Sequence, residues 1–338
     1  ENAALLYSGD TGFYSGASAL VERLQAQGYQ PVVLPGLSSV QMLSAALGRP
    51  WQDWTLVSAH GCACDPVSAC MNHKTVFFLT GGAETPATLC AALTAAGLGD
   101  AHALVGENLG TPDEKIHFGT AQELAGQTFA SLSVLLVEHA VHPERRTPGL
   151  PDEAFIRGEV PMTKQEVRAA ILGKLSVRPG ETVYDVGAGT GAVTLEVARK
   201  ASDGTVYAVE RKPEAVALLH ENRIKLGGYN VKIIEGPAPE ALENLPAPDC
   251  VFVGGSGGRM REILALAREK NPEVRVVVNA IALETLFAAQ TALKELGFSD
   301  IEVTQLAATR GKPVGAYTML TANNPVFILS GRAANDTK

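Results

Sequence analysis

The first 140 residues of this chain contain very few basic side chains. Four lysines and arginines lie there against twelve aspartates and glutamates, whereas residues 141–338 are balanced in charge. Nucleic-acid-binding proteins present basic faces to phosphate, and this chain has a net charge of −8, so we expect no nucleic-acid partner. The asymmetry favours two separate units, which also suits a length of 338 residues.

Long apolar runs are also missing. None reaches the roughly 18 residues that cross a bilayer, and no basic stretch followed by an apolar core indicates a secretory signal. We therefore expect a cytoplasmic protein with no membrane partner. The five cysteines are few and odd in number, which favours free thiols over a disulfide framework. Hydrophobic residues make up 46% of the chain, which excludes disorder.

Between two patterned regions lies a stretch rich in proline and mixed charge. We interpret residues 141–160 as a linker between a first unit, 1–140, and a second unit, 161–332. A helical pattern then opens at Pro161, for which Thr163 is the expected N-cap and Glu166 completes a capping box.

The second unit alternates strand-like and helical runs. Alternation of this kind predicts a mostly parallel sheet with helices on both faces. No clear helix separates the last two strand-like runs, so we expect them to form an antiparallel edge. The seven expected strands are 182–186, 205–210, 231–235, 250–253, 274–279, 301–305 and 325–330.

A glycine-rich loop follows the first of these strands. It reads Asp185-Val186-Gly187-Ala188-Gly189-Thr190-Gly191 and precedes a helix, whose first N–H groups are free to bind a ligand. Gly187, Gly189 and Ala192 also satisfy the dinucleotide fingerprint, with Glu210 about 20 residues further on. A dinucleotide-dependent oxidoreductase therefore remains an alternative.

Asp185 favours S-adenosyl-L-methionine over a dinucleotide. A carboxylate at this position would repel pyrophosphate, whereas it can pair with the ammonium of an amino-acid-bearing ligand. Glu210 would then hold the ribose hydroxyls. Pro237 stands where many methyltransferases have an aspartate that meets adenine, so adenine would contact the backbone nearby. The predicted cofactor-binding residues are Thr163, Asp185, Gly187, Ala188, Gly189, Thr190, Gly191, Glu210, Gly236, Ala238 and Gly254.

From Pro161 onward the chain closely resembles the CbiT-type methyltransferases of cobalamin biosynthesis. The matching stretches include PMTKQEVRA, DVGAGTGAVTLE, VYAVER, PDCVFVGGSGG and VVVNAIALET. The resemblance implies a class I S-adenosylmethionine-dependent methyltransferase with a Rossmann-like, mostly parallel seven-stranded sheet. It further implies methylation of precorrin-6B or cobalt-precorrin-6B at C15 with decarboxylation of the C12 acetate, and a homo-oligomer, expected to be a tetramer.

The first unit resembles the CbiE-type tetrapyrrole methylases, which methylate C5. The matching stretches are SGDTGFYSGA, PGLSSVQ, LVSAHG and VGENLGTPDEKI. The fused arrangement resembles the precorrin-6Y C5,15-methyltransferases (decarboxylating). The opening strand and Gly-Pro-Gly loop of that family have no counterpart here, so we expect an α/β unit that lacks its first segment. Gly9, Asp10 and Phe13 would line its cofactor cleft or form only a surface turn.

A corrin precursor carries many carboxylates, so its site should contain basic or hydrogen-bonding side chains. The candidates on the substrate side are Asn279, Glu284, Arg259 and Lys164, and no residue is assigned a catalytic role. The resemblance implies that C15 of the reduced macrocycle is electron-rich enough to attack the methyl group without a strong base. We predict no metal catalysis by the protein. A loop containing Cys62, Cys64 and Cys70 could bind zinc, but its spacing is unusual for that metal.

Two other function classes remain open. Because fold does not fix substrate, the second unit could methylate RNA or protein, with the first unit serving as a non-catalytic docking domain. The net charge of −8 argues against RNA as the substrate.

Overall fold

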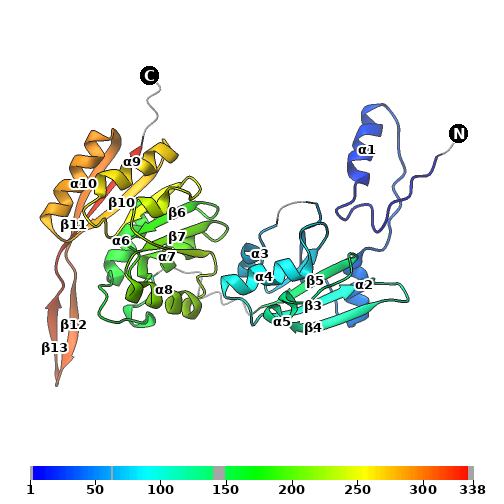
Figure 1. Ribbon diagram of the computed structural model, residues 1–338, viewed down its shortest axis with the longest axis horizontal. Coiled ribbons are helices and arrows are strands. Elements are labelled where there is room, and N and C mark those ends of the chain that lie inside the picture. The colour runs from blue at the N-terminus through cyan, green and yellow to red at the C-terminus, as the bar shows by residue number, and fades with distance from the viewer. Residues whose placement is uncertain (1–2, 62–63, 140–148, 334–338) are drawn as a thin grey trace. The chain divides into compact units, whose positions relative to one another are not determined.

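A computed structural model describes residues 3–61, 64–139 and 149–333 of the chain. The chain divides into two compact units, Glu1–Val141 and His142–Lys338 (Figure 1). In the described part, no helix is both long and apolar enough to cross a membrane.

The first unit is built on a five-stranded mixed sheet in the order β1-β2-β5-β3-β4. Strands β1 and β2 are parallel, and the other neighbours are antiparallel. Leu43, Phe77 and Leu136 are among the residues of its core. In chain order its elements are α1 (Ala17–Ala26), α2 (Ser39–Leu47), β1 (Thr55–Ser58), α3 (Pro66–Asn72), β2 (Thr75–Leu79), α4 (Pro86–Ala96), β3 (His102–Glu107), β4 (Lys115–Thr120), α5 (Ala121–Ala125) and β5 (Ser133–Glu138).

The second unit contains the predicted seven-stranded sheet, in the order β11-β14-β10-β9-β6-β7-β8. The five strands from β10 to β8 are parallel, and β14 is antiparallel to both β10 and β11, which confirms the predicted antiparallel pair. Its elements are η2 (Asp152–Ala154), α6 (Gln165–Leu175), β6 (Thr182–Val186), α7 (Ala192–Lys200), β7 (Thr205–Glu210), α8 (Pro213–Leu226), β8 (Val231–Glu235), η3 (Glu240–Leu242), β9 (Cys250–Val253), α9 (Met260–Lys270), β10 (Arg275–Ala280), α10 (Leu283–Glu295), β11 (Phe298–Leu306), β12 (Thr309–Val314), β13 (Tyr317–Ala322) and β14 (Val326–Ala333).

Helices cover both faces of this sheet because successive strand side chains point to opposite sides. Val183 of β6 packs in a core with α6, α7 and Leu219 of α8. The next residue, Tyr184, belongs to a second core with α9 and α10 on the other face (Figure 1).

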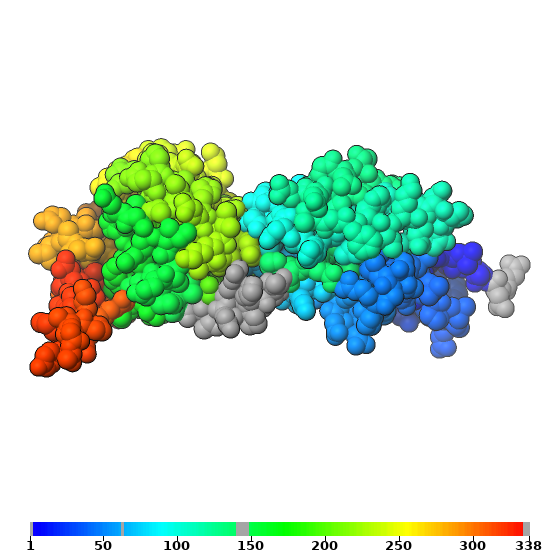
Figure 2. Space-filling view, turned by 90° about the horizontal axis from the view of Figure 1, so that it is seen from below, coloured from blue at the N-terminus to red at the C-terminus, as the bar shows by residue number. Residues whose placement is uncertain are grey.

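A hairpin of β12 and β13 was not predicted from the sequence. Among the described residues the two strands pair only with each other, and the hairpin projects from the second unit (Figures 1 and 2). Most of its residues are exposed, so the sequence has no inward-outward alternation to indicate strands, and Pro313 further weakens the pattern.

The structure also differs from the expected start of the second unit. Residues 140–148 of the predicted linker lie outside the described residues, but residues 149–160 pack onto the second unit, where Asp152 and Phe155 are buried. Helix α6 begins at Gln165 with Lys164 as its N-cap, so the predicted Thr163–Glu166 capping box is wrong. Both residues instead contact arginines, because Arg168 donates to the Thr163 carbonyl and Glu166 pairs with Arg310.

Candidate functional site

The glycine-rich loop lies at the point where the strand order of the second sheet reverses. The chain runs outward from β6 to β7 and β8, then returns to β9 on the other side of β6. Open α/β sheets bind ligands at such a switch point, beyond the carboxyl ends of the strands. The loop connects β6 to α7, so it occupies that place.

Close backbone approach explains why glycine is required in this loop. Gly187 has φ +74°, and a Cβ atom there would lie 2.7 Å from backbone atoms of Gly255. Gly191, the N-cap of α7, has φ +81°, and a Cβ atom there would lie 2.3 Å from Leu219. A side chain at Gly187 would push apart the two glycine segments that surround the site, and one at Gly191 would displace the Leu219 side chain of α8.

Glu210 ends β7 with its carboxylate held by backbone N–H groups. Its Oε2 accepts from the Gly189 N–H at 2.9 Å, and its Oε1 accepts from the N–H groups of Arg211 at 2.8 Å and Lys212 at 2.9 Å. The glycine loop thus contacts the acid that the sequence predicted to bind ribose.

Asp185 is a buried carboxylate at the end of β6. Thr194 of α7 donates its hydroxyl to Oδ2 at 2.5 Å, while Oδ1 is buried without a hydrogen-bond partner among the described residues. Burial raises the pKa of Asp185 to about 7, with a smaller contribution from the nearby charge of Glu210. A buried carboxylate oxygen of this kind is suited to a cationic ligand group.

Two adjoining cavities flank the glycine loop. One, of about 360 Å³, is called the Asp185 cavity here; its lining includes the predicted residues Thr163, Lys164, Asp185, Gly187, Ala188, Gly189, Thr190, Gly254 and Asn279. The other, of about 320 Å³, is called the Glu210 cavity; its lining includes Gly187, Gly189, Glu210, Gly236, Ala238, Gly254 and Arg259. Gly191 is the N-cap of α7 and lines neither cavity.

The substrate-side candidates are only partly brought together. Asn279 lines the Asp185 cavity with a buried Oδ1 that has no partner in the described part of the chain, and Lys164 lies at the same cavity. Arg259 is already paired with Glu240 and Glu262. Glu284 is exposed in the first turn of α10 and lines neither cavity.

The sequence reasoning missed several lining residues of the Asp185 cavity. Ile281 follows β10 and is 66% exposed, and Asn323 and Asn324 lie between β13 and β14. Ile281 could have been predicted as a lining residue, because it is apolar and directly follows a buried strand. The two asparagines could not have been predicted, because the hairpin that precedes them was not predicted from the sequence.

In the first unit, Gly9, Asp10 and Phe13 line a cavity of about 510 Å³ rather than forming only a surface turn. Asp10 accepts from the N–H groups of Gly36 at 2.9 Å and Gly12 at 2.8 Å, which lowers the pKa of its carboxyl. The carboxylate therefore joins its own loop to Gly36.

The cysteine-rich loop offers no metal site in its described part. Cys62 lies outside the described residues, and the residues that are described contain no group of three His, Cys, Asp or Glu side chains placed to hold a metal. Cys70 is buried in α3, and burial raises the pKa of its thiol to about 12. It is therefore a core side chain.

Family models match both units. Residues 153–332 match the model described as the precorrin methyltransferase domain. Residues 1–125 match the model described as tetrapyrrole (corrin/porphyrin) methylases.

Two curated relatives carry the printed name "Probable cobalt-precorrin-6B C(15)-methyltransferase (decarboxylating)". The protein of Pyrobaculum calidifontis is 46% identical over 190 residues, which are 55% of this chain and 97% of that protein. The protein of Methanothermobacter thermautotrophicus is 40% identical over 193 residues, which are 56% of this chain and 99% of that protein.

Solved structures give the same result. A precorrin-6Y C5,15-methyltransferase from Geobacter metallireducens is 34% identical with a TM-score of 0.54, covering 57% of this chain and all of that one. A precorrin-8W decarboxylase from Methanobacterium thermoautotrophicum is 41% identical with a TM-score of 0.51, covering 54% of this chain and 98% of that one.

Proposed function

The chain belongs to the precorrin methyltransferase family, and from that premise we propose that it transfers the methyl group of S-adenosyl-L-methionine to C15 of precorrin-6B or cobalt-precorrin-6B. The acetate side chain at C12 loses its carboxylate as carbon dioxide and takes up a proton, which leaves a methyl group at C12. The observation that carries the proposal is the glycine loop at the switch point of the sheet, with buried Asp185 on one side and Glu210 on the other. The names of the relatives add the C15 position and the decarboxylation.

The residues present fit the cofactor. The buried Oδ1 of Asp185 suits the ammonium of its methionine part, and the absence of a side chain at Gly187 lets the backbone of Gly255 pack against the loop beside that part. Glu210 suits the ribose hydroxyls, and the segment from Gly236 to Ala238 offers backbone groups to adenine. When bound, the cofactor supplies an electrophilic methyl group on a sulfonium.

In this proposal the chain accelerates methyl transfer mainly by holding the cofactor and the corrin precursor in line. Holding two reactants in line can supply about 7–11 kcal/mol of barrier reduction in favourable cases. Asn279 and Lys164 lie at the Asp185 cavity, where they can hydrogen-bond substrate carboxylates, and Ile281 gives the macrocycle an apolar contact. For the first unit we propose C5 methylation, provided that this unit is intact, through the cavity lined by Asp10 and Phe13.

A product assay tests the function. The full chain is incubated with methyl-labelled S-adenosylmethionine and cobalt-precorrin-6B, and products are followed by mass spectrometry. We expect one labelled methyl group at C15 and one carbon dioxide per turnover from the second unit. An additional methyl at C5 would show that the first unit is active. A parallel incubation replaces the corrin precursor with total cellular RNA and protein; label there, with none in the corrin precursor, would contradict the proposal and favour the alternative of a macromolecular substrate.

We propose further that the protein is a homo-oligomer, with a tetramer as the expected form. Support comes from the hairpin, where Tyr317 and Leu320 are 79% and 77% exposed on strands that, in the described residues, pair with no strand but each other. Exposed apolar side chains gathered on one element are typical of an interface.

Charges placed on the hairpin should reduce the molecular mass in solution. In the double variant Tyr317→Glu, Leu320→Glu, buried charges would oppose association, and we expect monomers by light scattering coupled to size-exclusion chromatography. Phe118→Glu, which changes an exposed side chain of β4 in the first unit, is the matched control and should keep the wild-type mass. An unchanged mass in the hairpin variant would exclude the hairpin as the interface.

A further inference from the structure

The segment of residues 149–164, called the strap here, forms part of the wall of both cavities. Val160 and Pro161 line the Glu210 cavity, and Pro161 continues with Met162 and Thr163 along the Asp185 cavity. The position of the strap therefore sets the width of the cleft in which cofactor and substrate meet.

Buried side chains of two helices hold the first part of the strap. Glu196 of α7 is fully buried and accepts from the N–H groups of Gly149 at 2.7 Å and Leu150 at 2.8 Å. Asn222 of α8 accepts from the N–H of Ile156 at 2.7 Å and donates to the carbonyl of Thr190 at 2.9 Å. The strap is thereby connected to the glycine loop itself.

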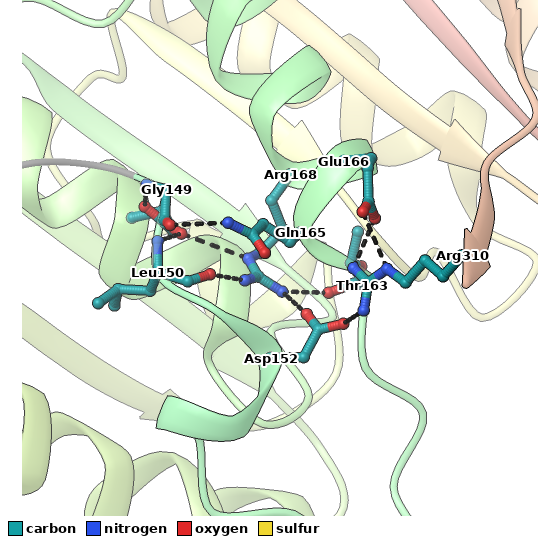
Figure 3. Close-up of polar contacts among 9 residues, drawn as sticks. Gly149, Leu150, Asp152, Thr163, Gln165, Glu166, Arg168 and Arg310 are labelled. Atoms are coloured by element: carbon teal, nitrogen blue, oxygen red, sulfur yellow. Dashed lines mark hydrogen bonds and ion pairs between the residues drawn. The ribbon is translucent and has the colours of Figure 1, made fainter. Parts of the chain in front are cut away.

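Arg168 of α6 joins the two ends of the strap. Its buried guanidinium donates to the Thr163 carbonyl at 2.6 Å, to Asp152 Oδ1 at 2.7 Å and to the Leu150 carbonyl (Figure 3). The guanidinium also lies 4.8 Å from the ring centre of Phe155. A single cation thus fixes both the beginning and the end of the segment.

A second arginine reaches this cluster from the projecting hairpin. Arg310 of β12 binds Asp152 Oδ2 at 2.8 Å and forms a two-point contact with the carboxylate of Glu166, at 2.9 Å and 2.5 Å (Figure 3). Asp152 therefore has one guanidinium on each oxygen. Burial acts to raise the pKa of Asp152, but hydrogen bonds from Arg168 and Arg310 outweigh it, so the pKa lies below its ordinary value.

We propose that Arg310 is a positioning residue for methyl transfer, which holds the strap against the cofactor cleft through Asp152 and Glu166. The inference rests on the proposed function, since it assigns Arg310 to that same site. The side chain is 36% exposed and lines neither cavity, so it acts through the carboxylates and not by touching cofactor. Both sides of its planar fork are already occupied by carboxylates, which argues against a direct contact with substrate carboxylates.

Binding of S-adenosylhomocysteine to the full chain tests the proposal by calorimetry. Arg310→Ala should raise the dissociation constant about tenfold, because the strap then loses a charge-assisted anchor. Glu166→Gln should give a smaller increase, and the double variant should add little to Arg310→Ala, since both changes break the same contact. Arg261→Ala, which removes an exposed ion pair between Arg261 of α9 and Glu295 of α10, is the matched control and should leave the dissociation constant unchanged.

Hydrogen exchange without ligand provides a second readout. In Arg310→Ala the amides of Gly149, Leu150 and Ile156 should exchange faster, while those of β6 should not. Wild-type affinity and wild-type exchange of these amides in Arg310→Ala would overturn the inference. An unchanged cofactor affinity with a raised KM for the corrin substrate alone would also overturn it, in favour of direct substrate binding. A wild-type chain that binds no S-adenosylhomocysteine would instead overturn the proposed function, and the inference with it.

Discussion

Replacing Asp185 by asparagine is expected to weaken the binding of S-adenosylhomocysteine by at least about thirtyfold. The reason is that a buried carboxylate oxygen without a protein partner in the described residues would lose its charge opposite a buried ammonium. Truncating one partner of such a buried charge pair costs about 2–5 kcal/mol. Calorimetric titration of the two proteins at pH 8 measures the change.

The pH dependence of this binding has a defined sign. Since burial raises the pKa of Asp185 to about 7, the free protein is largely protonated there at pH 6 and largely ionised at pH 8. Only the ionised form attracts an ammonium, so affinity in the wild type should increase from pH 6 to pH 8. In Asp185→Asn it should be nearly flat over the same range.

Glu210→Gln provides the matched comparison. The charge of Glu210 contributes to the raised pKa of Asp185, so its removal should move the rise in affinity to lower pH even though binding itself is weaker. If affinity in the wild type did not depend on pH between 6 and 8, Asp185 would not be the ammonium partner.

Replacing Asp185 by asparagine should also raise the thermal stability of the protein in the absence of ligand. Between the ordinary pKa of 3.8 and about 7, Asp185 holds a proton in the folded protein but not in the unfolded chain. The contribution of Asp185 to the free energy of unfolding therefore falls as pH rises through this window, and the decrease levels off above about pH 7. Asp185→Asn avoids this cost, so at pH 8 the variant should unfold at a higher temperature than the wild type by differential scanning calorimetry.

The sequence predicted those parts of the molecule that local patterns determine. The alternation of strands and helices predicted the seven-stranded sheet, and the glycine loop with Asp185 and Glu210 marked segments that line the two cavities at its switch point. These features are visible because each depends on a few neighbouring residues with a fixed period or spacing.

The strap was not predictable in the same way. Asp152 and Phe155 lie among prolines and charges, as in a linker, and their burial depends on Arg168, which contacts both of them from a helix further along the chain. One signal was present: Arg168 stands between the apolar residues Val167 and Ile171 on the inward face of α6. A charge at such a position predicts a buried partner, although it does not say which segment supplies it.

Replacing Arg168 by methionine should destabilise the second unit more than any surface substitution. The arginine is fully buried, and its loss would leave the carboxylates of Asp152 and Glu196 together in the interior without Arg168. Removing one partner from a buried ion pair costs about 3–5 kcal/mol. For a unit of this size each kcal/mol lowers the melting temperature by about 2–4 °C, so we expect a decrease of about 6–20 °C.

Scanning calorimetry of the full chain measures this decrease, and the transition of the second unit is identified as the one that S-adenosylhomocysteine raises. Arg168→Lys keeps the charge but lacks the fork that reaches four acceptors, so its decrease in melting temperature should be intermediate. Adding Asp152→Asn and Glu196→Gln to Arg168→Met should recover part of the stability, because neutralising a whole buried set costs less than breaking it. A decrease below about 2 °C in Arg168→Met alone would mean that the two carboxylates are protonated or hydrated in the folded protein, and that the strap is held chiefly by its backbone contacts with Glu196 and Asn222.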